Sequence, residues 1–143
     1  MLEQIEECIL MFNKYQNKLD TITSTDLCKD YEQTKKEIQE LKTQQDNVLK
    51  KLETILNHYF EDTLKWYCRK IKVKNHLQSD DIWDMILGVQ IEFPFFYNYD
   101  CRQYHCLISL FEKMNKENSC ICYHNGRHFY VYNPFCKTRV DEK

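Results

Sequence analysis

The chain has very little glycine and proline, with two residues of each in 143. These two residue types usually make up about 12% of a protein together. Gly88 is the first of either kind along the chain. Since Gly and Pro mark most turns, a chain with so few turn residues before Gly88 is expected to be helical there.

Long apolar runs are also missing from the sequence. No stretch approaches the roughly 18 consecutive apolar residues that a membrane-spanning helix needs, and neither end carries a lipidation motif. The first residues, from Met1 to Glu7, carry acids where a secretory signal would carry basic residues and then an apolar run. We therefore expect no membrane contact and an intracellular location, in cytoplasm or nucleus.

Neither sign of charge dominates, with 20 Lys and Arg against 22 Asp and Glu and a formal net charge of −2. Binding of nucleic acid would therefore need a local basic patch. The chain has eight Cys, which in a small secreted domain would indicate disulfides. Without a signal peptide, and with helices to supply a core, the thiols are expected to be reduced.

The longest regular pattern covers residues 26–74, which contain no Gly or Pro. Apolar side chains recur there at alternating steps of four and three residues, the heptad spacing of a coiled-coil seam. Gln45 lies at one seam position, where a polar residue fixes the register at some cost in stability. The expected oligomer interface along this seam consists of Leu27, Tyr31, Ile38, Leu41, Val48, Leu52, Ile55 and Tyr59.

A first amphipathic helix is predicted over residues 2–19, ahead of this long helix. Thr23 and Asp26 have capping-box spacing, so a new helix is expected to start there, although the chain could also run through as one helix. A helix over residues 26–74 would be about 70 Å long, too long to pack on a small domain throughout. Its apolar stripe is expected to meet the first helix folded back, the same helix of another subunit, or a different chain.

The remainder of the chain reads as a small mixed domain. We predict a short helix over residues 79–87, a strand from Val89 to Phe93 and a helix from about Arg102 to Lys116. Asn125-Gly126 between two β-rich runs predicts a hairpin. The sequence thus predicts an α+β fold, with a helical coiled-coil arm over residues 1–74 and a small α+β head with an antiparallel sheet over residues 75–143.

The register of the predicted hairpin assigns side chains to two faces. Cys122 and His124 are expected on one face, with Phe129 and Val131 of the second strand. Tyr123 and Tyr130 are expected on the other face.

Cys and His residues near the carboxyl end could form a metal site or a catalytic site. Cys101, His105, Cys120 and Cys122 could supply four zinc ligands, but they lack a Cys-x-x-Cys turn, and Cys is commonly buried in sheets. Cys101 could act as a nucleophile with His128, but no third orienting group is identifiable. We expect no metal, no cofactor and no enzymatic activity, and zinc binding remains the alternative.

Basic residues gather between Lys65 and His76, with Trp66 and Tyr67 among them. This run could bind nucleic acid or an acidic partner. The simpler interpretation places these cations at the C-terminal end of the predicted long helix, where they would offset the helix macrodipole.

Aromatic side chains are more numerous in the predicted head than one small sheet can bury. Tyr is enriched in protein interfaces, because it combines a large apolar area with a hydroxyl group. We therefore expect the more polar face of the hairpin, with part of the segment before it, to contact a partner. The predicted partner-binding residues are Phe95, Phe96, Tyr97, Tyr99, Tyr123, Tyr130 and Tyr132.

These patterns together predict a non-enzymatic structural or adaptor subunit. It would form a homo- or heterodimer through the coiled coil and would dock a protein partner through its head. The alternative is a small nucleic-acid-binding or zinc-binding module that its helical arm dimerises. Coiled-coil arms with small α+β heads recur in chromosome-segregation and other cytoskeletal assemblies, which is an analogy of architecture only.

Overall fold

Two amphipathic helices begin the chain. The computed structural model describes residues 1–22, 29–65, 69–77, 86–94, 102–117, 121–125 and 128–132. Helix α1 spans Leu2–Thr21 and helix α3 spans Tyr31–Tyr59. The carboxylate of Asp30 caps α3 by accepting a hydrogen bond from the backbone N–H of Gln33, at 3.2 Å. The capping box predicted for Thr23 and Asp26 lies outside the described residues, and α3 begins five residues later than expected.

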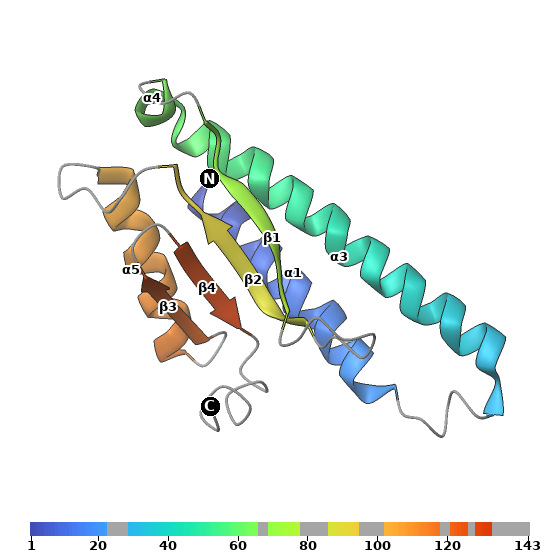
Figure 1. The fold of residues 1–143 in the computed structure, drawn as a ribbon. Coiled ribbons are helices and arrows are strands. Elements are labelled where there is room, and N and C mark those ends of the chain that lie inside the picture. The colour runs from blue at the N-terminus through green and yellow to red at the C-terminus, as the bar shows by residue number, and fades with distance from the viewer. Residues whose placement is uncertain are drawn as a thin grey trace.

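Helices α1 and α3 pack side by side and antiparallel, as a hairpin (Figure 1). The side-chain Nε2 of Gln45 donates to Oε1 of Gln16 at 3.0 Å and to the carbonyl of Phe12 at 3.4 Å. Because these atoms are buried between the two helices, Gln45 fixes the register of α3 against α1 within one chain. Of the three predicted partners for the stripe of α3, the first helix folded back is therefore the one observed here.

Four strands form one antiparallel sheet in the order β1-β2-β4-β3. Strand β1 is Lys72–Leu77 and β2 is Ile86–Glu92. Helix α5, Arg102–Lys116, follows, and the chain then adds β3, Ile121–Asn125, and β4, His128–Tyr132. The predicted α+β class with a small antiparallel sheet is confirmed.

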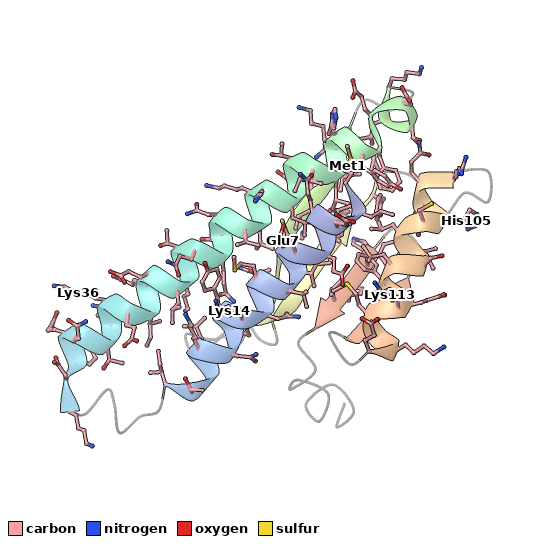
Figure 2. All side chains as sticks on the ribbon, turned by 180° about the vertical axis from the view of Figure 1, so that it is seen from behind. Met1, Glu7, Lys14, Lys36, His105 and Lys113 are labelled. Carbon is pink, nitrogen blue, oxygen red and sulfur yellow. The ribbon has the colours of Figure 1, made fainter. Side chains whose placement is uncertain are left out.

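Helices cover one side of this sheet. Helix α3 packs on β1, α1 packs on β2, and α5 packs beside β3. Figure 1 views the molecule from the sheet side, and Figure 2, turned by 180°, views it from the helix side with α1 between α3 and α5. None of the helices in the described ranges has the length and apolar character needed to cross a membrane.

A cluster of aromatic rings joins the helical hairpin to the sheet. The ring of Phe93, just after β2, lies 5.3 Å from Phe60, 5.5 Å from Tyr104 and 5.4 Å from Phe129, measured between ring centroids. All four side chains are buried, and such edge-on pairs stabilise a core beyond their area burial. The cluster belongs to one apolar core that includes residues of α1, α3, α5 and the sheet, so the core continues across the predicted boundary at residue 74.

The predicted continuation of the long helix to Lys74 is wrong. Helix α3 ends at Tyr59, the short helix α4 covers Glu61–Leu64, and β1 has begun by Lys72. Ile71 is buried and Val73 half-buried, whereas Lys72 and Lys74 are exposed, which is the period-two pattern of a strand with one covered face. The simpler interpretation, which placed Lys72 and Lys74 at the end of a helix, is therefore wrong, because both lie in β1.

The later elements agree more closely with the sequence. The predicted helix from Arg102 to Lys116 is confirmed with those bounds. The two faces predicted for the hairpin are confirmed, since Cys122 pairs with Val131 and Tyr123 pairs with Tyr130. The predicted register is wrong by two residues, because Asn125, expected in the turn, belongs to β3 and pairs with His128. The helix predicted over residues 79–87 is wrong at its end, where Ile86 and the following residue belong to β2. The rest of that segment lies outside the described residues.

Side chains of α3 cover the outer edge of β1. Asn57 accepts a hydrogen bond from the backbone N–H of Ile71 at 2.9 Å and donates to the carbonyl of Ile71 at 3.0 Å. Oε1 of Glu53 accepts a third bond, from the backbone N–H of Val73, at 2.9 Å. An uncovered strand edge invites pairing with another chain, so these two side chains both attach the sheet to α3 and close that edge.

Replacing Asn57 with Ala should lower the free energy of unfolding by about 1–3 kcal/mol, because the backbone groups of Ile71 lose their partners in a half-buried site. Urea titration measures the loss, and amide exchange at Ile71 should accelerate. Asn47→Ala, at an exposed position of the same helix, is the matched control and should change little. Equal losses in the two variants would show that the edge bonds contribute nothing.

Replacing Leu52 with Ala should lower the free energy of unfolding by about 2–5 kcal/mol, because the side chain is 1% exposed inside the shared core. Helical circular dichroism and aromatic fluorescence should still report one common transition. Leu41→Ala should cost less, since Leu41 is 8% exposed and lies outside that core. Separate transitions for helices and sheet would contradict a shared core.

Candidate functional site

The sheet face turned away from the helices is left uncovered by the described elements (Figure 1). Residues alternate across each strand, and the pairing of Lys74 with Gln90 and of Gln90 with Tyr130 places these three on that face. Lys74 is exposed, and Gln90 and Tyr130 are half-exposed. We call this surface the open face. Its described side chains are Lys72, Lys74, Gln90, Glu92, His128 and Tyr130.

Aromatic and charged groups meet on the two inner strands of the open face, at the end where β2 finishes and β4 begins. The rings of His128 and Tyr130 stack with centroids 6.2 Å apart and planes at 25°. Nε2 of His128 lies 3.8 Å from Oε1 of Glu92, and both side chains are 32% exposed. At that distance and exposure the pair adds little stability. The side chains of His128 and Glu92 are thus reached by solvent from the open face.

Cations dominate the β1 side of the open face. Lys72 and Lys74 are exposed there, and the exposed Arg69 and Lys70 precede the strand. A cavity of about 450 Å³ at this corner is lined by Arg69, Lys70, Lys72, Glu92, Phe93 and Pro94. The open face thus offers a basic rim beside an aromatic pair, an arrangement that suits an acidic ligand with an apolar or planar group.

The predicted partner-binding residues fall into two groups. Tyr130 lies on the open face. Tyr123 pairs with Tyr130, and Tyr132 pairs with Gly88, so both hold register positions on that face. The other four residues, Phe95, Phe96, Tyr97 and Tyr99, lie outside the described residues.

Several residues of the open face were missed in the sequence. Lys72 and Lys74 were assigned to a helix end, although their alternation with Ile71 and Val73 was a visible strand signal. Gln90 and Glu92 fall within the strand predicted from Val89 to Phe93, but the sequence alone assigns them no role. His128 was considered only as a catalytic base, and on the open face it stacks on Tyr130 instead.

The predicted oligomer seam is largely occupied within the chain. Leu41 and Leu52 are buried, and Val48, Ile55 and Tyr59 are half-buried against the core. Ile38 is half-buried, whereas Tyr31, at the far end of α3, is 58% exposed. Leu27 lies outside the described residues. That the seam joins two chains stays a prediction. The contact between chains would have to form at the exposed end of α3, around Tyr31.

Three of the cysteines lie within the described residues. Cys8, Cys106 and Cys122 form no disulfide, and Cys8 and Cys122 pack in or against the core. In the part of the chain that the structure describes, no group of three or more His, Cys, Asp or Glu could hold a metal ion. Cys101 and Cys120 lie outside that part, so the zinc hypothesis is not tested.

A groove of about 610 Å³ runs along α5 on the helix side of the molecule, where Figure 2 labels His105 and Lys113. Its floor is apolar and its rim is basic. The groove is separated from the open face by the sheet itself, so the two surfaces could bind independently. The lining residues are Leu2, Arg102, His105, Cys106, Ser109, Leu110 and Lys113.

Comparisons of the chain with protein-family models, with curated proteins and with solved structures find no match. No known active site or binding site can therefore be transferred to these residues.

Cys8 should react with an alkylating reagent more slowly than Cys106 in the folded protein. Burial raises the pKa of the Cys8 thiol, an effect that Lys51 opposes and Glu7 reinforces, so less of the reactive thiolate forms at a given pH. Cys106 is half-exposed in the α5 groove. Mass spectrometry of alkylated peptides measures both rates. Unfolding in urea should equalise them, and equal rates in the native protein would show that Cys8 is not protected.

Proposed function

We propose that this protein is a non-enzymatic adaptor subunit that holds a protein partner on the open face of its sheet. The observation that carries the proposal is the contrast along β4. Phe129 and Val131 are buried under the helices, whereas His128 and Tyr130 remain half-exposed on the other side. A half-exposed aromatic pair on a sheet face is typical of a surface that another molecule covers.

The charges of the open face indicate the character of the partner. The rim formed by Lys72 and Lys74 favours a segment with acidic residues, which would be steered to the sheet by long-range attraction. Tyr130 and His128 favour an aromatic or apolar anchor in that segment. Glu92 beside His128 would discriminate against a partner with an acid at the anchor position.

Within this proposal the α1–α3 hairpin supports the sheet. It packs on the inner face, and Asn57 and Glu53 bind the backbone of Ile71 and Val73 at the β1 edge. A further role of α3 in joining chains, through the predicted seam around Tyr31, remains part of the proposal. Cys8, Cys106 and Cys122 form no disulfide, which supports the intracellular location that we propose.

Single-stranded nucleic acid is the second candidate ligand. Antiparallel sheets bind unpaired bases by stacking them on aromatic side chains beside cations, and the open face combines the stacked rings of His128 and Tyr130 with Lys72 and Lys74. The carboxylate of Glu92 beside His128 and the net charge of −2 favour a protein partner instead. Fluorescence anisotropy with a labelled oligonucleotide separates the two. Binding that falls steeply with salt and disappears in Lys72→Glu would favour nucleic acid.

Replacing Tyr130 with Ala should weaken capture of the partner by about 1–3 kcal/mol. The free energy of unfolding should change little, because the side chain is half-exposed. Capture is measured by passing extract of the source cells over immobilised full-length protein and quantifying the proteins retained. Lys42→Ala, at an exposed position of α3 to which no binding role is assigned, is the control and should retain them.

Phe129→Ala provides the opposite control, since Phe129 is 1% exposed and its loss should unfold the domain. If Tyr130→Ala unfolds the protein in the same way, Tyr130 is a core residue and the assignment of the open face is wrong. If Tyr130→Ala stays folded and retains every protein that the parent chain retains, the binding surface lies elsewhere.

A further inference from the structure

The outward face of α1 carries apolar side chains that no described element covers. Leu10 and Met11 are each 41% exposed at the middle of the helix. They lie on the solvent side of the helix layer, between Glu7 and Lys14, which Figure 2 labels. Adjacent large apolar side chains in solvent, on a helix otherwise packed well against the sheet, indicate a surface that is covered in the functional state.

The exposed side chains of this face follow a symmetric order. Acids occupy the first half of the helix, the apolar pair occupies the middle and bases occupy the second half. Counted from the midpoint between residues 10 and 11, each acid has a base at the same separation on the other side. Steps of four and three residues lead to the adjacent pair Leu10 and Met11 from either side. The stripe consists of Glu3, Glu7, Leu10, Met11, Lys14 and Lys18, all of them exposed.

We propose that this stripe is a self-association surface, on which a second copy of the chain docks its own α1 in antiparallel orientation. A two-fold axis between Leu10 and Met11 would bring Glu7 opposite Lys14 of the second copy. The same axis would bring Glu3 opposite Lys18, and each of these pairs occurs twice. The two copies of Leu10 and Met11 would cover one another around the axis.

Charge complementarity selects this occupant and this orientation. A parallel arrangement would place acids against acids and bases against bases, which is unfavourable. In the antiparallel arrangement, each charged residue of the stripe lies opposite a residue of opposite charge in the second copy. A second copy is therefore a sufficient partner for this surface. The seven-residue spacing between Glu3 and Leu10, and between Met11 and Lys18, keeps the stripe on one side of the helix, as a helix–helix seam requires.

This surface is independent of the open face and of the α3 seam. It lies on the helix side of the molecule, whereas the open face lies on the far side of the sheet (Figure 1). A dimer built on α1 would therefore leave both open faces accessible and pointing away from one another. Two identical faces in one particle bind a multivalent partner more tightly than either face alone.

Charge exchange in the full-length chain tests the proposal. One variant carries Glu3→Lys and Glu7→Lys, a second carries Lys14→Glu and Lys18→Glu, and a third carries all four changes. Sedimentation velocity over a range of concentrations gives the dissociation constant of each dimer, and circular dichroism checks folding. All changed residues are exposed, so the variants should fold.

The parent chain should form a dimer, and each of the first two variants should raise its dissociation constant roughly tenfold or more, since attraction becomes repulsion at four symmetric positions. An equimolar mixture of these two variants should form a heterodimer, because one stripe is then wholly basic and the other wholly acidic. The third variant should dimerise as the parent chain does. A parent chain that stays monomeric, or a third variant that fails to recover dimerisation, would overturn the proposal.

Two further variants locate the contact. Changing Leu10 and Met11 to Gln together should dissociate the dimer, whereas exchanging Lys36 with Glu40 on the exposed side of α3 is the matched charge control and should leave it intact. If Tyr31→Gln dissociates the dimer and the α1 variants do not, the contact is the α3 seam and the proposal is wrong. None of these results bears on the open face, because partner capture by Tyr130→Ala is measured separately.

Discussion

Burial of one side of a four-stranded sheet under α1, α3 and α5 is the constraint on which the rest of this structure depends. The ring of Phe93 lies at its centre, within about 5.5 Å of rings from the end of α3, from α5 and from β4. Since the hydrophobic effect scales with apolar area removed from water, neither the helical hairpin nor the sheet could bury this surface alone. The two are therefore parts of one folding unit.

The placement of all three helices on the same side has a direct functional consequence. The other side of the sheet has no described cover, and the side chains described on it are charged, polar or aromatic. The side chains of Glu53 and Asn57 close the β1 edge, so a partner would meet a face rather than a free edge there. The outward side of α1 lies on the opposite surface, which separates the proposed partner site from the proposed dimer contact.

Much of the secondary structure follows from local patterns. The helix from Arg102 to Lys116 has a single apolar stripe, and its bounds match the prediction. Asn125-Gly126 predicted the β3–β4 hairpin and its two faces, but the register differs by two residues, because Asn125 extends β3 and pairs with His128. The end of α3 was missed, since the short alternation around Val73 was outweighed by the long heptad pattern before it.

Tertiary arrangement was less accessible from the sequence. A heptad stripe specifies that α3 must be buried against a helix, but it does not specify which helix. The same residues, Leu52 among them, suit a second chain or α1, and only the path of the chain decides between them. Gln45 was recognised as a register-fixing residue, yet its partner Gln16 could not be identified without the fold.

Only the part of the candidate site that lies in local structure was predicted from the sequence. Tyr130 was found because the hairpin is a local structure. Lys72 and Lys74 reach the open face only through the pairing of β1 with β2, which depends on the misread end of the long helix. The basic rim that Lys72 and Lys74 form is therefore visible only in the tertiary structure.

Native-state hydrogen exchange of the full chain tests the central claim, that hairpin and sheet share one core, most directly. Amides of α1 and α3 near Ile9 and Leu52 should exchange through the same global opening as amides of β2 and β4 near Val89 and Val131. The four should then show equal opening free energies and equal dependence on denaturant. Strand amides that open with a clearly smaller free energy, while the helices stay protected, would show that the hairpin and the sheet are separate units and would contradict the account.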